Sequence, residues 1–148
     1  MASVEEQNKA LVLQMYEEVW NKGNVDYVNT AFSPQFKDHP PKRASQAPDR
    51  GRDYITTAVN DYRQAMPDFH TQLVKIVAEE NRVMYVGRMT GTHTGNYLRV
   101  PPSGNKVEVL RIDDFIVENG KIVERWSMFN LMAMMQQMGV MPAAPGAH

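Results

Sequence analysis

The hydrophobic period of the chain changes at Pro67, and this change constrains the fold more than any other feature of the sequence. Before Pro67, apolar residues recur at three- and four-residue steps, which is typical of helices that bury one face. After Pro67, the chain has runs rich in valine, isoleucine and aromatic residues, separated by turn residues, as in antiparallel strands. Helices followed by consecutive strands indicate an α+β fold with the helices packed on one face of a curved sheet.

Three helices are expected in the first half. The first begins near Val4, because Ser3 and Glu6 have the spacing of a capping box, and it ends at Gly23. A shorter helix follows, and the third spans about residues 53–66. The length of 148 residues suits one domain, which we place at residues 1–142.

Two segments are expected to lack regular structure. Residues 40–51 are proline-rich and basic, and a loop of this length can act as a lid. Residues 143–148 are predicted to be a disordered end.

The dipeptide Asn119-Gly120 predicts a two-residue hairpin turn, because both turn positions tolerate positive φ. An uninterrupted register from this turn places Asp113 opposite Trp126 and Arg111 opposite Met128. Because side chains alternate along a strand, the hairpin then has two distinct faces. One face carries Arg111, Asp113, Phe115, Glu124, Trp126 and Met128, and the other carries Asp114 opposite Arg125.

Composition excludes several classes of function. Sixteen lysines and arginines against seventeen acids leave a formal charge of −1, which argues against nucleic acid or an anionic membrane as partner. The absence of cysteine removes thiolate metal sites and cysteine nucleophiles. No segment approaches the roughly 20 apolar residues of a membrane span, and the N-terminus does not resemble a signal peptide. A soluble, cytoplasmic protein is the expectation.

Asp113 is the most informative single residue. The predicted register places it in an apolar strand environment, where a carboxylic acid can stay protonated and donate a hydrogen bond to a developing oxyanion. The alternative is a structural ion pair with Arg111, two residues away on the same face.

The histidines are the other titratable candidates. His39, beside Asp38 and before two prolines, is a candidate general base, and the alternative is an ordinary surface histidine. His93 lies between glycines in GTHTG, where it either contacts a ligand or bonds a neighbouring threonine. The histidines do not have metal-ligand spacing, so no metal is expected. The sequence also lacks a nucleotide-binding motif, so no cofactor is expected.

Five strings carry a family resemblance over most of the chain: MYEEVWNKGNVD, AMPDFH, TGTHTGNYLRVPPSGNKVEV, RIDDFIVENGKIVERW and MMQQMGVMP. The chain resembles SnoaL-like polyketide cyclases, also called ester cyclases, of the NTF2-like superfamily. The resemblance implies a cone-shaped barrel, in which three N-terminal helices pack against a curved, mostly antiparallel sheet around a pocket. It also implies a homodimer through the open face of the sheet.

Ketosteroid isomerase, a more distant relative of the same fold, gives a comparison by residue. Asp113 and Tyr16 fall where that enzyme has its two oxyanion donors, an aspartic acid kept neutral by its apolar site and a tyrosine. His39 falls near its aspartate base. The sequence departs from many SnoaL-like relatives at Ser127 and Asn130, where those relatives carry acids.

The resemblance implies a cofactor-independent enzyme that enolises a small apolar carbonyl or polyketide-like compound, for isomerisation or intramolecular aldol-type cyclisation. The alternatives are a ligand-binding dimer without chemistry, and a hydrolase or dehydratase that uses a pocket carboxylate. The candidate catalytic residues are Asp113, His39 and Tyr16, and the candidate substrate-binding residues are Trp20, Asp38, Arg111, Phe115, Glu124, Trp126, Met128, Asn130 and His93.

Overall fold

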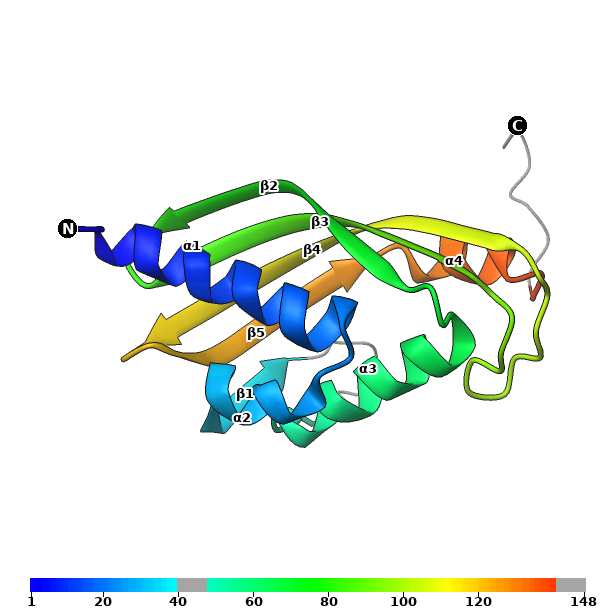
Figure 1. Cartoon of the computed structure of the whole chain (residues 1–148), viewed down its shortest axis with the longest axis horizontal. Coiled ribbons are helices and arrows are strands. Elements are labelled where there is room, and N and C mark those ends of the chain that lie inside the picture. Colours follow the sequence, from blue (N-terminus) through cyan, green and yellow to red (C-terminus); the bar gives the residue numbers. More distant parts are fainter. Residues whose placement is uncertain (40–47, 141–148) are drawn as a thin grey trace.

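The computed structural model describes residues 1–39 and 48–140 and has the predicted α+β architecture (Figure 1). Helices cover one face of a curved five-stranded sheet that is not closed into a barrel. Most of the predicted lid and all of the predicted disordered end lie outside the described residues. Among the described residues, no helix is long and apolar enough to cross a membrane.

The first helix begins as the capping box predicts. Helix α1 spans Val4–Met15, and the Ser3 hydroxyl accepts a hydrogen bond from the Glu6 amide at 3.1 Å. The chain then continues as a π-helical turn over Tyr16–Asn21, which hydrophobic periodicity did not indicate. Gly23 ends the segment at a φ of 73°.

The second predicted helix is shorter than expected. A 3-10 turn (Val25–Tyr27) leads into α2 (Val28–Ala31), and β1 then spans Phe32–His39. Helix α3 covers Asp53–Ala65 and buries one apolar face in the core, as the spacing predicts.

The second half forms the rest of the sheet and a final helix. Its strands are β2 (His70–Glu79), β3 (Arg82–Thr92), β4 (Lys106–Glu118) and β5 (Lys121–Phe129), and α4 spans Leu131–Gln137. The strand order is β1-β5-β4-β3-β2. Strand β1 is parallel to β5, and the other pairs are antiparallel. Helix α1 packs against β2 and β3.

The predicted hairpin turn is present, but the predicted register holds only for its first pairs. Val117 pairs with Ile122 as expected, and Ile116 then pairs with Glu124, so that Val123 is an extra residue in β5. Such a β-bulge shifts the alternation of every following side chain to the other face.

The bulge changes the predicted partners on β4. Asp113 pairs with Ser127 rather than Trp126, and Arg111 pairs with Phe129 rather than Met128. The predicted faces are therefore wrong beyond Val123. Glu124, Trp126 and Met128 share the open face of the sheet with Asp114, whereas Arg125 and Ser127 join the face that carries Arg111, Asp113 and Phe115.

The hairpin turn gives a direct test of backbone strain. Gly120 has a φ of 72°, and a Cβ built there would meet no atom within 4 Å, so only the backbone conformation opposes a side chain. We expect Gly120→Ala to lower the free energy of unfolding by about 1 kcal/mol in urea denaturation. Gly51→Ala is the matched control, because that position is equally open and lacks a positive φ. Equal effects of the two substitutions would contradict the assignment of strain to the turn.

Candidate active site

Asp113 is the centre of a buried polar cluster on the inner face of β4. Its side chain is fully buried, and its Oδ2 accepts a hydrogen bond from the Tyr16 hydroxyl. The Arg111 Nε lies 3.3 Å from Oδ1. Oδ1 has no hydrogen-bond partner among the described residues. A buried carboxyl oxygen without a hydrogen-bond partner is unusual in a folded protein, which makes this oxygen a candidate contact for a substrate atom.

Tyr16 is held in position by a second tyrosine. Its ring stacks on Tyr85 with centroids 3.8 Å apart, and the Tyr85 hydroxyl lies 3.0 Å from Thr71 Oγ1. Gly87 makes this possible, because a Cβ there would lie 2.4 Å from the Tyr85 ring. Burial, followed by the neighbouring Asp113 carboxyl, raises the pKa of Tyr16 well above its usual value. Tyr16 therefore remains a phenol donor.

Arg111 lies against Asp113 and is itself buried. Its Nε and Nη2 donate to the Ser127 hydroxyl at 3.1 and 3.0 Å. Its Nη1 donates to the Met89 thioether at 3.4 Å, and its guanidinium carbon lies 5.5 Å from the Trp20 ring centroid. Burial opposes the positive charge, but Asp113 together with Tyr62 and Tyr16 outweighs burial and raises the pKa of Arg111. Because a thioether is a weak acceptor, Nη1 is the donor most available to a ligand oxygen.

A second buried ion pair adjoins this cluster. The Asp38 carboxylate accepts from Arg125 Nε at 2.7 Å and from Arg50 Nη2 at 2.6 Å, and it is fully buried. Burial acts to raise the pKa of Asp38, but the two arginines outweigh burial and lower it. The charge of Arg125 also interacts with Asp113, so the two ion pairs form one electrostatic unit.

His39 lies on the opposite side of the sheet from Asp113. Successive residues of β1 alternate, so Asp38 faces inward and His39 stacks on Trp126, with ring centroids 4.5 Å apart. His39 Nδ1 is 2.9 Å from Asp49 Oδ1, and its Nε2 is 3.8 Å from Glu124 Oε2. The prediction that His39 and Asp113 share one pocket is wrong.

Two further candidates have structural partners. Asn130 is exposed, and its side chain caps α4 by accepting from the Ala133 amide at 2.9 Å. His93 is fully buried, with Nδ1 2.9 Å from the Ser103 hydroxyl, and desolvation lowers its pKa. Neither residue belongs to the Asp113 cluster.

The structure thus brings together part of the predicted set. Phe115 also belongs to the Asp113 cluster, because its ring packs edge-on against the Tyr16 ring with the centroids 6.1 Å apart. The predicted residues in the cluster are Tyr16, Trp20, Arg111, Asp113 and Phe115, with Asp38 joined through Arg125. Sequence reasoning missed Arg50, Tyr85 and Arg125 as neighbours of this site. The family resemblance marked the position of Ser127, but the predicted register placed that residue on the other face. Nothing in the sequence marks the bulge that turns Arg125 and Ser127 inward.

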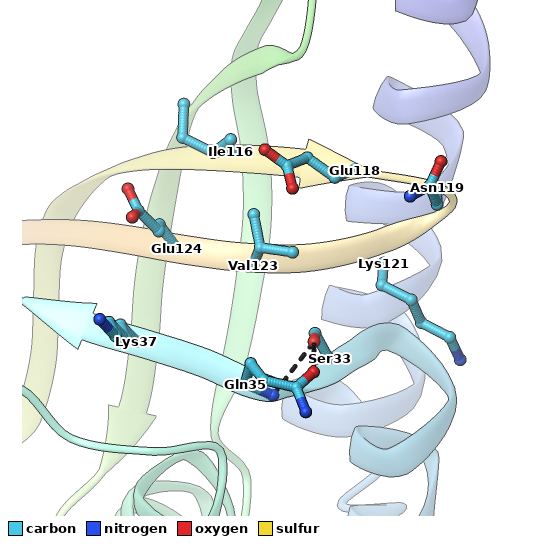
Figure 2. A pocket seen from close by; sticks show the side chains of 9 residues that line it. All are labelled: Ser33, Gln35, Lys37, Ile116, Glu118, Asn119, Lys121, Val123 and Glu124. Atoms are coloured by element: carbon cyan, nitrogen blue, oxygen red, sulfur yellow. Dashed lines mark hydrogen bonds between the residues drawn. The ribbon is translucent and has the colours of Figure 1, made fainter.

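A separate hollow of about 500 Å³ lies on the open face where β1 diverges from β5 (Figure 2). Its wall combines lysine and glutamate side chains around two apolar ones, and it does not include Asp113. The residues that line it are Ser33, Gln35, Lys37, Ile116, Glu118, Asn119, Lys121, Val123 and Glu124. Within the described part of the chain, no three acidic or histidine side chains gather as metal ligands.

Comparisons with known proteins agree on fold and family. The sequence model of the SnoaL-like polyketide cyclases matches residues 10–138. The structure is similar to a candidate SnoaL-like polyketide cyclase from Jannaschia sp. CCS1, with 25% identity, a TM-score of 0.82, and 96% of this chain and 98% of that chain covered. No protein with a curated function matches the sequence significantly.

Two structures of Streptomyces proteins are similar to this chain to about the same degree. IdmH, a candidate polyketide cyclase from S. antibioticus, has 25% identity and a TM-score of 0.78 over 90% of this chain and 99% of that chain. AclR, a candidate hydroxylase from S. galilaeus, has 25% identity and a TM-score of 0.82, with 95% of this chain and 85% of that chain covered. Relatives of one fold thus carry different proposed chemistries, and the function must be argued from the site.

The Asp38 ion pairs predict a pH-dependent stability. Because the pKa of Asp38 is lowered in the folded chain, its contribution is present above the unfolded value of about 4 and is lost as the pH falls through the lower folded value. We expect Asp38→Asn to lower the free energy of unfolding by about 3 kcal/mol at neutral pH. Urea denaturation between about pH 7 and pH 2 should show this difference shrinking with acidity.

The matched control for this experiment is Asp26→Asn, since Asp26 is exposed. Its effect should stay within about 0.5 kcal/mol. A difference between wild type and Asp38→Asn that is constant from neutral to acidic pH would contradict the assignment.

Proposed function

Because the chain belongs to the SnoaL-like polyketide cyclase family, we propose that it is a cofactor-free enzyme that enolises a small, largely apolar carbonyl compound at Asp113. The observation that carries the proposal is the free Oδ1 of Asp113 beside the Arg111 guanidinium. Enolisation needs a base and an anion-stabilising donor close together, and these two groups are adjacent in a buried site.

Asp113 acts as the base in this proposal. Its Oδ1 takes a proton from the carbon next to the substrate carbonyl, and the electron pair of the broken C–H bond moves onto the carbonyl oxygen. The Tyr16 hydroxyl donates to Oδ2 and fixes the orientation of the carboxyl group. This role differs from the sequence prediction, in which Asp113 donates to the oxyanion, because here the carboxyl group accepts a hydrogen bond and faces a cation.

Arg111 stabilises the negative charge that forms on the oxygen. Its Nη1 is aimed at a weak acceptor, the Met89 sulfur, and can exchange that contact for the enolate oxygen. A preorganised donor in the oxyanion hole of a serine protease lowers the barrier by on the order of 3–4 kcal/mol, and a contribution of this size is expected here. Two bonds to Ser127 hold the rest of the guanidinium in place.

The enolate then has two outcomes, which correspond to the two reactions of the proposal. Where the substrate has a carbon–carbon double bond conjugated with the enolate, return of the proton from Asp113 to the far end of that double bond gives an isomer. Attack of the enolate carbon on a second carbonyl of the same molecule forms a carbon–carbon bond, and the resulting alkoxide takes the proton from Asp113. Both outcomes restore the carboxylate.

The geometry supports enolisation over the hydrolase or dehydratase alternative. That alternative paired Glu124 with Arg111 around a water, but Glu124 pairs with Ile116 on the open face, whereas Arg111 is buried on the inner face. His39 has no role in the proposed steps, because it also lies on the other side of the sheet.

We also propose that the open face of the sheet binds a second copy of the chain. This face carries two ion pairs within the chain, Arg82 with Asp114 and Arg88 with Glu108, so neither sign of charge dominates it. Between the charges lies an exposed apolar surface, which is typical of an interface. Its residues are Met84, Leu110, Ile112, Trp126 and Met128.

The dimer proposal can be tested by a substitution that introduces one charge in the centre of this surface. We expect wild type to sediment as a dimer and Ile112→Lys to sediment as a monomer at micromolar concentration, because the lysine would be buried without a partner. Leu98→Lys is the control, since Leu98 is 67% exposed in the loop between β3 and β4. A monomeric wild type, or a dimeric Ile112→Lys variant, would contradict the proposal.

The catalytic proposal predicts that Asp113 and its neighbour Asp114 behave differently. We expect wild type to accelerate exchange of the α-protons of 2-tetralone in D₂O, followed by NMR, and Asp113→Asn to lower this rate about 100-fold. Asp114→Asn should retain the wild-type rate, because Asp114 pairs with Arg82 on the open face.

A binding measurement accompanies the exchange experiment, so that loss of catalysis can be distinguished from loss of binding. Binding of 2-naphthol, an enol mimic, together with no exchange in wild type would identify a ligand-binding protein without chemistry. Equal rates for Asp113→Asn and wild type, with both variants folded by circular dichroism, would refute Asp113 as the base.

A further inference from the structure

The ion-pair cluster, which consists of four buried groups and the partly exposed Arg50, contains more positive than negative groups. Two carboxylates, Asp38 and Asp113, face three guanidinium groups, those of Arg50, Arg111 and Arg125. The four buried groups balance in charge, so the excess is carried by Arg50, whose side chain is 32% exposed and can pair with a bound anion. The excess lies at the Asp38 end, because Arg111 and Asp113 balance each other while Asp38 alone faces two arginines.

In the part of the chain that the structure describes, no further buried carboxylate lies near this end. Residues 40–47, which connect β1 to the segment before α3, contain no acidic side chain and include a lysine and an arginine. Asp49 and Glu124 contact His39 instead, and their side chains are 45% and 37% exposed, so water solvates their charges.

Arg50 offers a specific donor for the missing anion. Its guanidinium lies over the Tyr54 ring at 3.4 Å, and its Nη2 donates to Asp38. Its Nε is buried and has no hydrogen-bond partner within residues 1–39 and 48–140. A buried guanidinium N–H without an acceptor is destabilising, which a ligand oxygen would relieve. The side chain as a whole is 32% exposed, so a ligand can reach it.

We infer that the ligand is a carbonyl compound that also carries a carboxylate, and that Arg50 binds this carboxylate while the carbonyl lies at Asp113 and Arg111. The inference rests on the proposed function, because it assigns the second end of the same substrate. Arg50 is a substrate-binding residue in this arrangement. Because Asp38 also pairs with Arg125, the Asp38 carboxylate does not fully neutralise the charge of Arg50.

The test compares acids with their uncharged counterparts. The probes are 4-hydroxyphenyl alkanoates with one, two or three methylene groups, each paired with its primary amide, and the phenol group serves as the enol mimic. We expect at least one acid to bind wild type tenfold or more tightly than its amide in isothermal titration calorimetry. This preference should weaken as salt is added, because it depends on charge.

Variants assign the preference to one side chain. Arg50→Gln should bring the acid-to-amide ratio close to one, and Arg50→Lys should retain part of it, since the charge remains. Arg52→Gln is the matched control and should keep the wild-type ratio, because Arg52 donates to the Phe32 carbonyl instead of joining the cluster.

The outcomes separate this inference from the proposed function. If phenols bind in an Asp113-dependent manner but acids and amides bind equally, or if the preference survives Arg50→Gln, the carboxylate subsite is refuted and the enolisation site stands. If neither the phenols nor the acids bind, both proposals fail.

Discussion

The bulge at Val123 is the feature on which the buried cluster depends. Without the extra residue, regular alternation would turn Trp126 toward Asp113 and send Arg125 to the open face. Two aspartates would then be buried with one inward arginine from the hairpin, Arg111. The bulge turns Arg125 inward, where it reaches Asp38 on the neighbouring strand, and it places Ser127 where it can hold Arg111. One backbone irregularity thus makes the burial of two carboxylates possible.

The helical side of the molecule has a corresponding irregularity. The π-helical turn over Tyr16–Asn21 lies directly after α1, and it carries both Tyr16 and Trp20 toward the sheet. Asn21 then joins the turn to β2 by bonding the backbone amide and carbonyl of Thr71. π-Helical turns are frequent at functional sites. The polar cluster is therefore built where both the helix and the hairpin depart from ideal geometry.

Much of the fold was predictable because its signals are local. The capping box at Ser3, the periodicity of α3 and the Asn119-Gly120 turn each depend on a few neighbouring residues, and the structure confirms all three. Asp113, Tyr16 and Arg111 also lie together as predicted, since β4 precedes the bulge and its alternation is undisturbed.

The errors begin after Val123, because a bulge depends on how three strands pair and leaves no mark in composition. The predicted place of His39 is wrong for a related reason. The sequence predicts no strand over residues 32–39, and in the strand that forms there, Asp38 and His39 face opposite sides.

The energetics of the cluster argue that it is kept for a reason other than stability. Replacing buried ion pairs with apolar side chains of similar size is often neutral or stabilising, whereas here five charged groups occupy the space between the helices and the sheet. Two of their polar atoms have no hydrogen-bond partner among the described residues, the acceptor Asp113 Oδ1 and the donor Arg50 Nε. A core selected only for stability would satisfy these atoms or remove them. An unpaired acceptor and an unpaired donor in one connected cluster are what a site needs if it takes a proton at one end and holds an anion at the other.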